Sequence, residues 1–322
     1  MTAKKAAKAK PAKVAVKKAV KKAAPSFASV TVDMHKGCAE FTSGKFRLAV
    51  TTQVGPRIIG GFIGKSKNLF RVLPPAVNPG GQTDFKLYGG HRLWHAPEMM
   101  PRTYAPDNAP VEIRETPEGT EFSSGIEAAT GLEKSILIAP LGNERYRITH
   151  RLTNRSLWDV ELAPWALSVM AQGGMAVIPH RTAAPLDQLL SDRILVFWPY
   201  TDLGDPRLSI GRDYVFVRQD NKAKGPCKIG LNVERGWAAY VNQGTALIKF
   251  FEPIEGVEYP DNGCHVESYS CKDFCELETL GPLCLLEPGD TVEHVELWLG
   301  LSGLPEIKTE ADVKKYIEPH VN

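Results

Sequence analysis

Hydrophobic residues in this chain recur in short runs separated by glycine and proline, and not in long helical stretches. The runs either alternate with polar residues or are wholly apolar, as half-buried and fully buried strands are. They include Arg47–Val50, Arg57–Ile59, Ser135–Ile138, Tyr146–Thr149, Arg193–Phe197, Tyr214–Val217, Ala246–Phe251 and Val292–Trp298. We expect a β-strand at each of them.

A helix is predicted only from Thr309 to Ile317, where Thr309 suits an N-cap and Asp312 stands three residues later. The 28 glycines and 24 prolines are spread evenly, and no segment repeats at a fixed period. The pattern therefore predicts an all-β fold. We expect one domain over residues 27–322, a sandwich of two large antiparallel sheets with a short C-terminal helix.

The first 26 residues differ from the rest in composition. They hold nine lysines and no acidic residue in an alanine- and proline-rich background, so they cannot form a core and are expected to be disordered. They lack the apolar run of a signal peptide. This basic tail is predicted either to contact nucleic acid or another polyanion, or simply to keep the protein in solution.

Beyond the tail, 30 basic residues stand against 37 acidic ones, which argues against a nucleic-acid-binding face on the domain itself. The chain has no apolar run that could span a membrane, and a cytoplasmic location is expected. The six cysteines are too few for a disulfide scaffold and are expected to be reduced. A zinc site among Cys264, His265, Cys271, Cys275 and Cys284 is disfavoured because no Cys-x-x-Cys pair occurs, so neither a metal nor another cofactor is expected.

The segment from Tyr88 to Glu98 carries the strongest indication of a binding site. Gly89 and Gly90 allow a sharp bend, and Pro97 ends the strand that follows. Between them stand two imidazoles, a guanidinium and an indole, with the carboxylate of Glu98 just beyond. An indole stacks on apolar ligand faces, while arginine and histidine reach hydroxyls or carboxylates. The alternative is a half-buried strand whose charged groups are solvated.

Several motifs, in order along the chain, resemble those of the galactose-mutarotase-like superfamily, and in particular one of its uncharacterised families. They are Gly55-Pro56-Arg57-Ile58, Asn68-Leu69-Phe70, Gly89 to Glu98, Asn154-Arg155-Ser156, Glu161 to Leu167, Trp198 to Asp202, Asp205-Pro206-Arg207, Tyr259-Pro260-Asp261, Phe274 to Glu278 and Leu286 to Asp290. The resemblance implies a β-supersandwich with a sugar-sized cleft on one sheet face, and aldose 1-epimerase-like activity without a cofactor. The expected partner is a small carbohydrate.

Sugar mutarotation needs one base and one acid on either side of the anomeric centre. The resemblance implies a catalytic Glu before the Pro288-Gly289 turn, and we expect Glu278 as base and His95 as acid, with Glu276 on the same strand face. The residues expected to bind the sugar are Arg57, His91, Arg92, Trp94, Glu98, Glu161, Trp165, Trp198, Tyr200 and Glu276.

The chain departs from the mutarotase pattern in one respect. Mutarotases carry their acid His in the strand after an Asn-containing turn, and the stretch from Asn154 to Leu167 has none; His180 is the nearest imidazole downstream. The alternative to an enzyme is therefore a non-catalytic carbohydrate-binding module of the same fold. A lyase or hydrolase acting on an oligosaccharide is the third hypothesis, and the lack of an additional domain for a long cleft counts against it.

Overall fold

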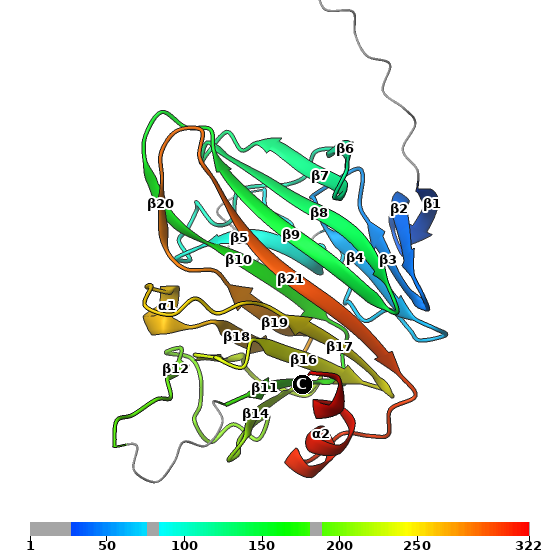
Figure 1. Ribbon diagram of the computed structural model, residues 1–322, viewed down its shortest axis with the longest axis vertical. Helices are drawn as coiled ribbons and strands as arrows, with labels where there is room; N and C mark the ends of the chain where they lie inside the picture. The colour runs from blue at the N-terminus through cyan, green and yellow to red at the C-terminus, as the bar shows by residue number, and fades with distance from the viewer. Residues whose placement is uncertain (1–26, 76–83, 181–188, 322) are drawn as a thin grey trace, which may run out of the picture.

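The protein is described by a computed structural model that covers residues 27–75, 84–180 and 189–321 (Figure 1). The basic tail therefore lies outside the described residues. The described chain forms one sheet of eleven strands and one of ten, and every strand pair is antiparallel. The prediction of two large antiparallel sheets is confirmed.

In spatial order, the first sheet contains β1 (Ala28–Val32), β2 (His35–Ser43), β3 (Phe46–Val50), β4 (Ile58–Ile63), β5 (Gly90–Ala96), β10 (Val160–Met170), β19 (Cys275–Leu280), β18 (Val266–Ser270), β15 (Cys227–Leu231) and β12 (Leu195–Phe197), with β20 (Cys284–Leu286) paired to β10. The second contains β13 (Leu208–Ile210), β14 (Tyr214–Arg218), β11 (Met175–Pro179), β16 (Trp237–Asn242), β17 (Thr245–Phe250), β21 (Thr291–Ser302), β9 (Arg145–Asn154), β8 (Leu132–Gly142), β7 (Gly119–Ile126) and β6 (Glu112–Thr116). Each expected strand overlaps one of these.

The expected C-terminal helix is α2 (Glu310–Tyr316). Thr309 is its N-cap, and the reciprocal bonds between Thr309 and Asp312 form the capping box that the sequence predicts. Val313 of this helix and Ile317, its C-cap, pack on the outer face of the second sheet, against a cluster that includes Trp237. In Figure 1 the helix lies beside β14, at one end of the molecule. The short turns α1 (Pro260–Gly263) and η1 (Glu318–His320) were not predicted, because so few residues show no periodicity.

The hydrophobic core lies between the two sheets, and strand alternation builds it. In β3, Phe46, Leu48 and Val50 are fully buried while Arg47 points to solvent. Strand β5 differs, because all seven of its residues are buried. One face of β5 meets the second sheet, and the other lies under a further apolar cluster that includes Phe85. This second layer, on the outer face of the first sheet, is where the candidate site forms.

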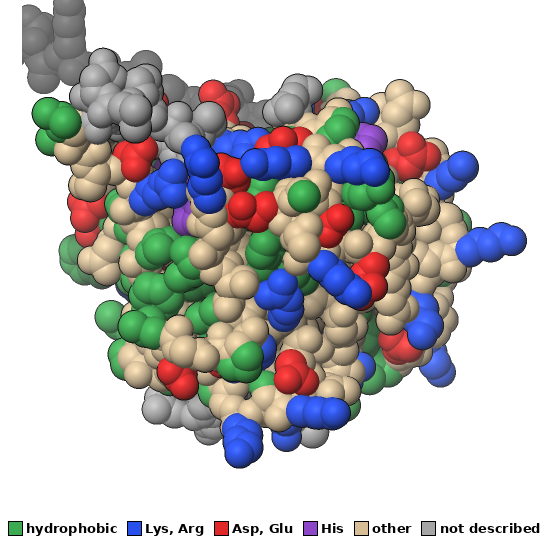
Figure 2. Space-filling view, turned by 90° about the horizontal axis from the view of Figure 1, so that it is seen from below, with side chains coloured by type: hydrophobic (Ala, Val, Ile, Leu, Met, Phe, Trp, Pro, Cys, Tyr) green, Lys and Arg blue, Asp and Glu red, His purple; other side chains and the backbone are tan. Residues whose placement is uncertain are grey.

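On the face seen in Figure 2, basic and acidic side chains are interspersed, so neither sign of charge predominates there. Hydrophobic side chains gather toward one side of this face. In the part of the chain that the structure describes, no helix has the length and apolarity needed to cross a membrane.

Candidate functional site

A cavity of about 300 Å³ opens on the outer face of the first sheet. Its floor is made by β5, β10, β15, β18 and β19, and its walls by the segments around residues 98–104 and 198–200. The lining residues are Leu87, Arg92, Trp94, Glu98, Tyr104, Trp165, Leu167, Trp198, Tyr200, Pro226, Lys228, Tyr269, Phe274 and Glu276. Aromatic walls with a few charged groups are typical of a site for a small polar ligand.

The register of the strands decides which side chains reach the cavity. In β5, Arg92 and Trp94 point outward, so His91 and His95 point to the interior between the sheets. Arg92 pairs with Leu167 of β10, and the outward alternation continues across the sheet.

On β19, Glu276 and Glu278 lie on the same outward face, as the strand period predicts. Glu276 lines the cavity, and Glu278 lies beneath it with no exposed surface. Nη2 of Arg92 donates to Oε1 of Glu276 across 3.1 Å. Burial raises the pKa of Glu276 to about 7, since desolvation and the nearby Glu278 outweigh the stabilising charges of Arg92 and Lys228. A carboxyl group with this pKa exchanges protons near neutral pH.

Lys228 of β15 is a buried cation in the cavity floor that the sequence analysis did not identify. Its Nζ lies 2.6 Å from Oε2 of Glu267 and 3.2 Å from Oε2 of Glu278. Burial lowers the pKa of Lys228, but the two carboxylates more than offset this and hold it well above its usual value. The only signal in the sequence was a single lysine within the apolar run Cys227–Leu231, a place where an unpaired charge would be costly.

Three indoles surround these charged groups. The Arg92 guanidinium lies 4.2 Å from the Trp94 ring centroid, and Lys228 Nζ lies 4.6 Å and 4.5 Å from the Trp165 and Trp198 centroids. The Nε1 of Trp165 donates to Oε2 of Glu278 across 2.8 Å. The indoles are therefore fixed by cation–π contacts and a hydrogen bond.

Arg57, expected to bind the ligand, instead supports the cavity wall from behind. It is fully buried and donates from Nε and Nη2 to Asp107 at 2.9 and 3.0 Å. Its Nη1 donates to the carbonyl oxygen of Leu87, a lining residue, across 2.7 Å. These bonds tie the segment before β5 to the sheet.

The cavity brings together seven of the expected residues: Arg92, Trp94, Glu98, Trp165, Trp198, Tyr200 and Glu276. Glu278 lies directly below it. The structure does not bring Arg57, His91, His95 or Glu161 to the lining. Glu161 is exposed on β10 where that strand pairs with β20, and His180 lies beside β14 in the other sheet. The structure therefore differs from the expectation that Arg57, His91, His95 and Glu161 line the ligand site.

His91 belongs to a polar network buried between the sheets. Its Nε2 lies 2.6 Å from Nε2 of His150, and its Nδ1 lies 2.8 Å from Oγ of Ser168. His150 Nδ1 faces the carbonyl oxygen of His294, which only accepts, so His150 carries its proton on Nδ1. His91 therefore donates from Nε2 and accepts from Ser168. Burial is the largest cause that lowers the pKa of both rings, which fits neutral imidazoles.

The same network contains a buried ion pair, in which Nζ of Lys249 lies 3.0 Å from Oε1 of Glu296. Glu296 also accepts from Nε1 of Trp298 at 2.7 Å and from Thr279 at 2.6 Å. His91, His150 and Glu296 are the one group of possible metal ligands in the described ranges. The hydrogen bond between His91 and His150, and the bonds that Glu296 accepts from Lys249, Thr279 and Trp298, account for the arrangement without an ion.

His95 lies on the interior side of β5, apart from that network. Neither of its ring nitrogens has a hydrogen-bond partner among the described residues. Burial lowers its pKa to about 2, with smaller contributions from Lys134 and Arg102, so His95 is neutral. It does not reach the cavity.

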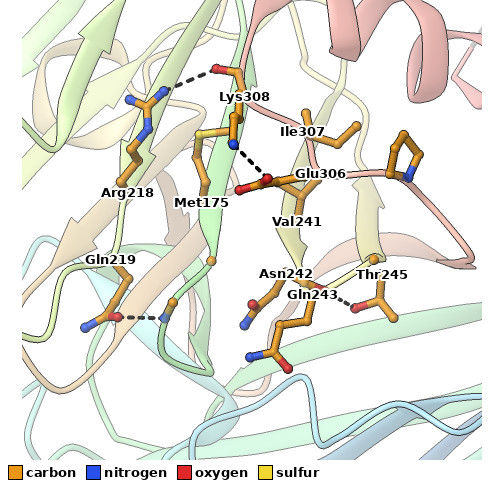
Figure 3. Close-up of a pocket in the computed structure, with 14 residues that line it drawn as sticks. Met175, Arg218, Gln219, Val241, Asn242, Gln243, Thr245, Glu306, Ile307 and Lys308 are labelled. Atoms are coloured by element: carbon orange, nitrogen blue, oxygen red, sulfur yellow. Dashed lines mark hydrogen bonds and ion pairs between the residues drawn. The ribbon is translucent and has the colours of Figure 1, made fainter.

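A larger depression, of about 570 Å³, lies at the ends of strands β11, β14, β16 and β17 of the second sheet (Figure 3). Arg218 and Lys308 lie on one side of it, and Gln219, Asn242 and Gln243 on the other. None of the described residues that line it is aromatic, and Lys308 is already paired with Glu306 at 2.7 Å. The smaller aromatic cavity is the better candidate for a ligand site.

Comparison with solved structures places this architecture among known folds. A galactose mutarotase-like protein from Lactobacillus casei is 9% identical and aligns over 82% of this chain and 100% of its own, with a TM-score of 0.51. The chain has the galactose mutarotase-like fold. A galactose mutarotase-like protein from Clostridium acetobutylicum aligns over 86% of this chain and 98% of its own (11% identity, TM-score 0.50). The Slr1438 protein from Synechocystis aligns over 83% and 96% (12% identity, TM-score 0.51). No protein-family model and no curated protein matches the sequence.

Proposed function

We propose that the protein binds a monosaccharide-sized carbohydrate in the cavity on the first sheet. The observation that carries the proposal is the juxtaposition of Trp94, Trp165 and Trp198 with Arg92 and Glu276 in one pocket of about 300 Å³. Indole faces stack on the C–H faces of a sugar ring, and charged groups bind its hydroxyls. The volume is at the lower end for ligand pockets and suits one sugar ring. The galactose mutarotase-like fold supports a carbohydrate ligand.

A thermal-shift screen tests this proposal. Neutral aldoses, amino sugars, sugar acids and sugar phosphates are each added in excess to the full chain. A ligand at 100 times its dissociation constant adds about 2.7 kcal/mol to the free energy of unfolding, which is a readily measured shift. Trp94→Ala should abolish the shift, while Trp158→Ala, at an indole that is 77% exposed outside the cavity, should preserve it. No shift with any sugar would contradict the proposal.

A second candidate function is aldose 1-epimerase chemistry, and the raised pKa of Glu276 favours it. In this reaction a base removes the anomeric hydroxyl proton while an acid protonates the ring oxygen; the C1–O5 bond breaks, C1=O forms, and reclosure gives the other anomer. We assign Glu276 or Glu278 as base. His95 faces the interior, so the acid is a donor in the cavity, Tyr200 or Lys228.

Saturation transfer between the anomers of a bound aldose, measured by nuclear magnetic resonance, separates catalysis from binding. Glu276→Gln and Glu278→Gln should each reduce exchange at least a hundredfold if that carboxylate is the base, because the amide keeps the shape and cannot take the proton. Glu161→Gln, at an exposed glutamate outside the cavity, is the control. A wild-type rate equal to that in buffer for every sugar that binds would leave a carbohydrate-binding module.

A further inference from the structure

We propose that the preferred ligand of the cavity is a cationic sugar, an aldose bearing a primary ammonium group. This inference rests on the proposed carbohydrate-binding function and specifies its substrate class. Two observations support it: the charged groups that face the cavity, and the ion pairs that already neutralise some of these groups.

The two cations of the site are paired within the protein. Lys228 lies within 3.2 Å of both Glu267 and Glu278, and it stands between the Trp165 and Trp198 rings. Arg92 is bonded to Glu276 and stacked on Trp94. Lys228 is therefore not available as a free counter-ion for an anionic ligand, whereas Nε and Nη1 of Arg92 have no hydrogen-bond partner among the described residues and can donate to sugar hydroxyls.

The carboxyl groups outnumber the cations. Glu276, Glu278 and Glu267 stand beside Arg92 and Lys228, and Glu98 on the cavity wall adds a fourth carboxyl group. Glu98 forms no ion pair with any described residue; its Oε1 accepts a hydrogen bond from the hydroxyl of Tyr104. Oε1 of buried Glu278 likewise has no hydrogen-bond partner in the described part of the chain. Burial raises the pKa of both Glu267 and Glu276, so neither supplies a full negative charge at pH 6.5. Glu98 is thus the carboxyl group on the cavity wall that is available to a cationic ligand.

The aromatic walls of the cavity also favour a positively charged ligand. Tyr104, Tyr200, Tyr269 and Phe274 line the cavity together with the three indoles. The negative face of an aromatic ring attracts a cation, and cages of aromatic rings with an acidic neighbour are a common way to hold an ammonium group.

A phosphate or carboxylate on the sugar would face the Glu98 carboxylate on the cavity wall, and like charges brought together in a site oppose binding. We therefore expect the order of affinity to be amino sugar, then neutral sugar, then sugar phosphate. Glu98, at the exposed end of the cavity, is the residue whose charge most directly meets the ammonium group.

Isothermal titration calorimetry on the full chain tests the inference with glucosamine and galactosamine, their uncharged parents glucose and galactose, and glucose 6-phosphate. We expect at least one amino sugar to bind tenfold or more tightly than its parent at pH 6.5. Glu98→Gln should reduce that ratio to threefold or less, and Glu161→Gln should leave it unchanged. Circular dichroism of each variant checks that it is folded.

The outcomes separate the two proposals. Equal affinity for the amino sugars and their neutral parents, or tighter binding of glucose 6-phosphate, overturns the cationic-ligand inference and leaves carbohydrate binding intact. Retention of the full preference by Glu98→Gln overturns the role of that carboxylate. Binding of none of the five sugars contradicts the proposed function itself.

Discussion

Arg92 and Glu276 form a buried ion pair across two strands that are not adjacent in the sheet, with Nη2 and Oε1 3.1 Å apart and β10 between them. The pair spans 184 positions of sequence and is almost closed to solvent on both sides. Despite the arginine, the net effect of burial and of Glu278 keeps the Glu276 carboxyl protonated to a higher pH than in an unfolded chain. The pair therefore links stability to pH.

The pH dependence of stability has a definite sign at this residue. An unfolded glutamate titrates at about 4.5, and Glu276 in the folded protein at about 7, so between these values only the unfolded state loses its proton. The free energy of unfolding should fall with rising pH through that window, by at most about 1.4 kcal/mol per pH unit from this group. Arg92, Glu278 and Lys228 are the charged groups that face it.

Urea unfolding at pH 5 and pH 7.5 measures this contribution. Glu276→Gln has no proton to lose, so between these two pH values its free energy of unfolding should fall less than that of the wild type, or rise more. Glu161→Gln should follow the wild type. Parallel behaviour of Glu276→Gln and the wild type would show that Glu276 has an ordinary pKa.

The hydrogen bond from Trp165 to Glu278 should be important for stability. Trp165→Phe keeps an aromatic ring but removes Nε1, leaving Glu278 with Lys228 alone, so the free energy of unfolding should drop by about 1–3 kcal/mol. Trp158→Phe, at an exposed indole, should change it by less than about 0.5 kcal/mol. Equal effects in chemical denaturation would mean that the bond contributes nothing.

Breaking the buried Lys249–Glu296 pair should lower the free energy of unfolding far more than breaking a partly exposed pair on the same strand, β21. Glu296→Gln leaves a fully buried ammonium group unpaired and should cost about 3–5 kcal/mol. Glu293→Gln breaks a partly exposed bond to Arg151 and should cost at most about 1 kcal/mol. Urea midpoints of the two variants provide the comparison, and similar midpoints would argue that the interior network is solvated.

His95 should be dispensable for stability and for the ligand. Both of its ring nitrogens are buried and have no hydrogen-bond partner among the described residues, so His95→Leu removes the cost of desolvating them at similar volume. The melting temperature should stay equal or rise, and sugar affinity should not change. A loss of affinity or of catalysed anomer exchange in this variant would restore the acid role implied by the family resemblance.

The sequence predicted the strands and the sheet architecture well because alternation is a local signal. The runs Tyr146–Thr149 and Val292–Trp298 carry it in full, and they pair as β9 and β21. Thr309 and Asp312 likewise mark the start of the C-terminal helix, since this capping signal lies within four consecutive residues. A turn such as α1 carries too few residues for any period.

The site was predicted only in part. Alternation indicates that neighbouring side chains of a strand point to opposite faces of the sheet, but not which of them faces outward. His91, Arg92, Trp94 and His95 were expected together, and the register with β10 divides them between two faces of the sheet. Lys228 was missed because its partners Glu267 and Glu278 come from distant strands. Contacts of this kind follow from strand order, which a single sequence does not state.

A crystal structure with a bound monosaccharide tests the central claim most directly. Crystals of the full chain are soaked with the sugar that gives the largest thermal shift, and a second crystal of Trp94→Ala serves as the control. The account predicts a sugar ring in the cavity on the first sheet, within hydrogen-bond distance of Glu276 or Arg92 and in contact with an indole, and an empty cavity in the variant. A sugar seated in the depression beside Arg218 and Asn242, with the aromatic cavity empty, would contradict it.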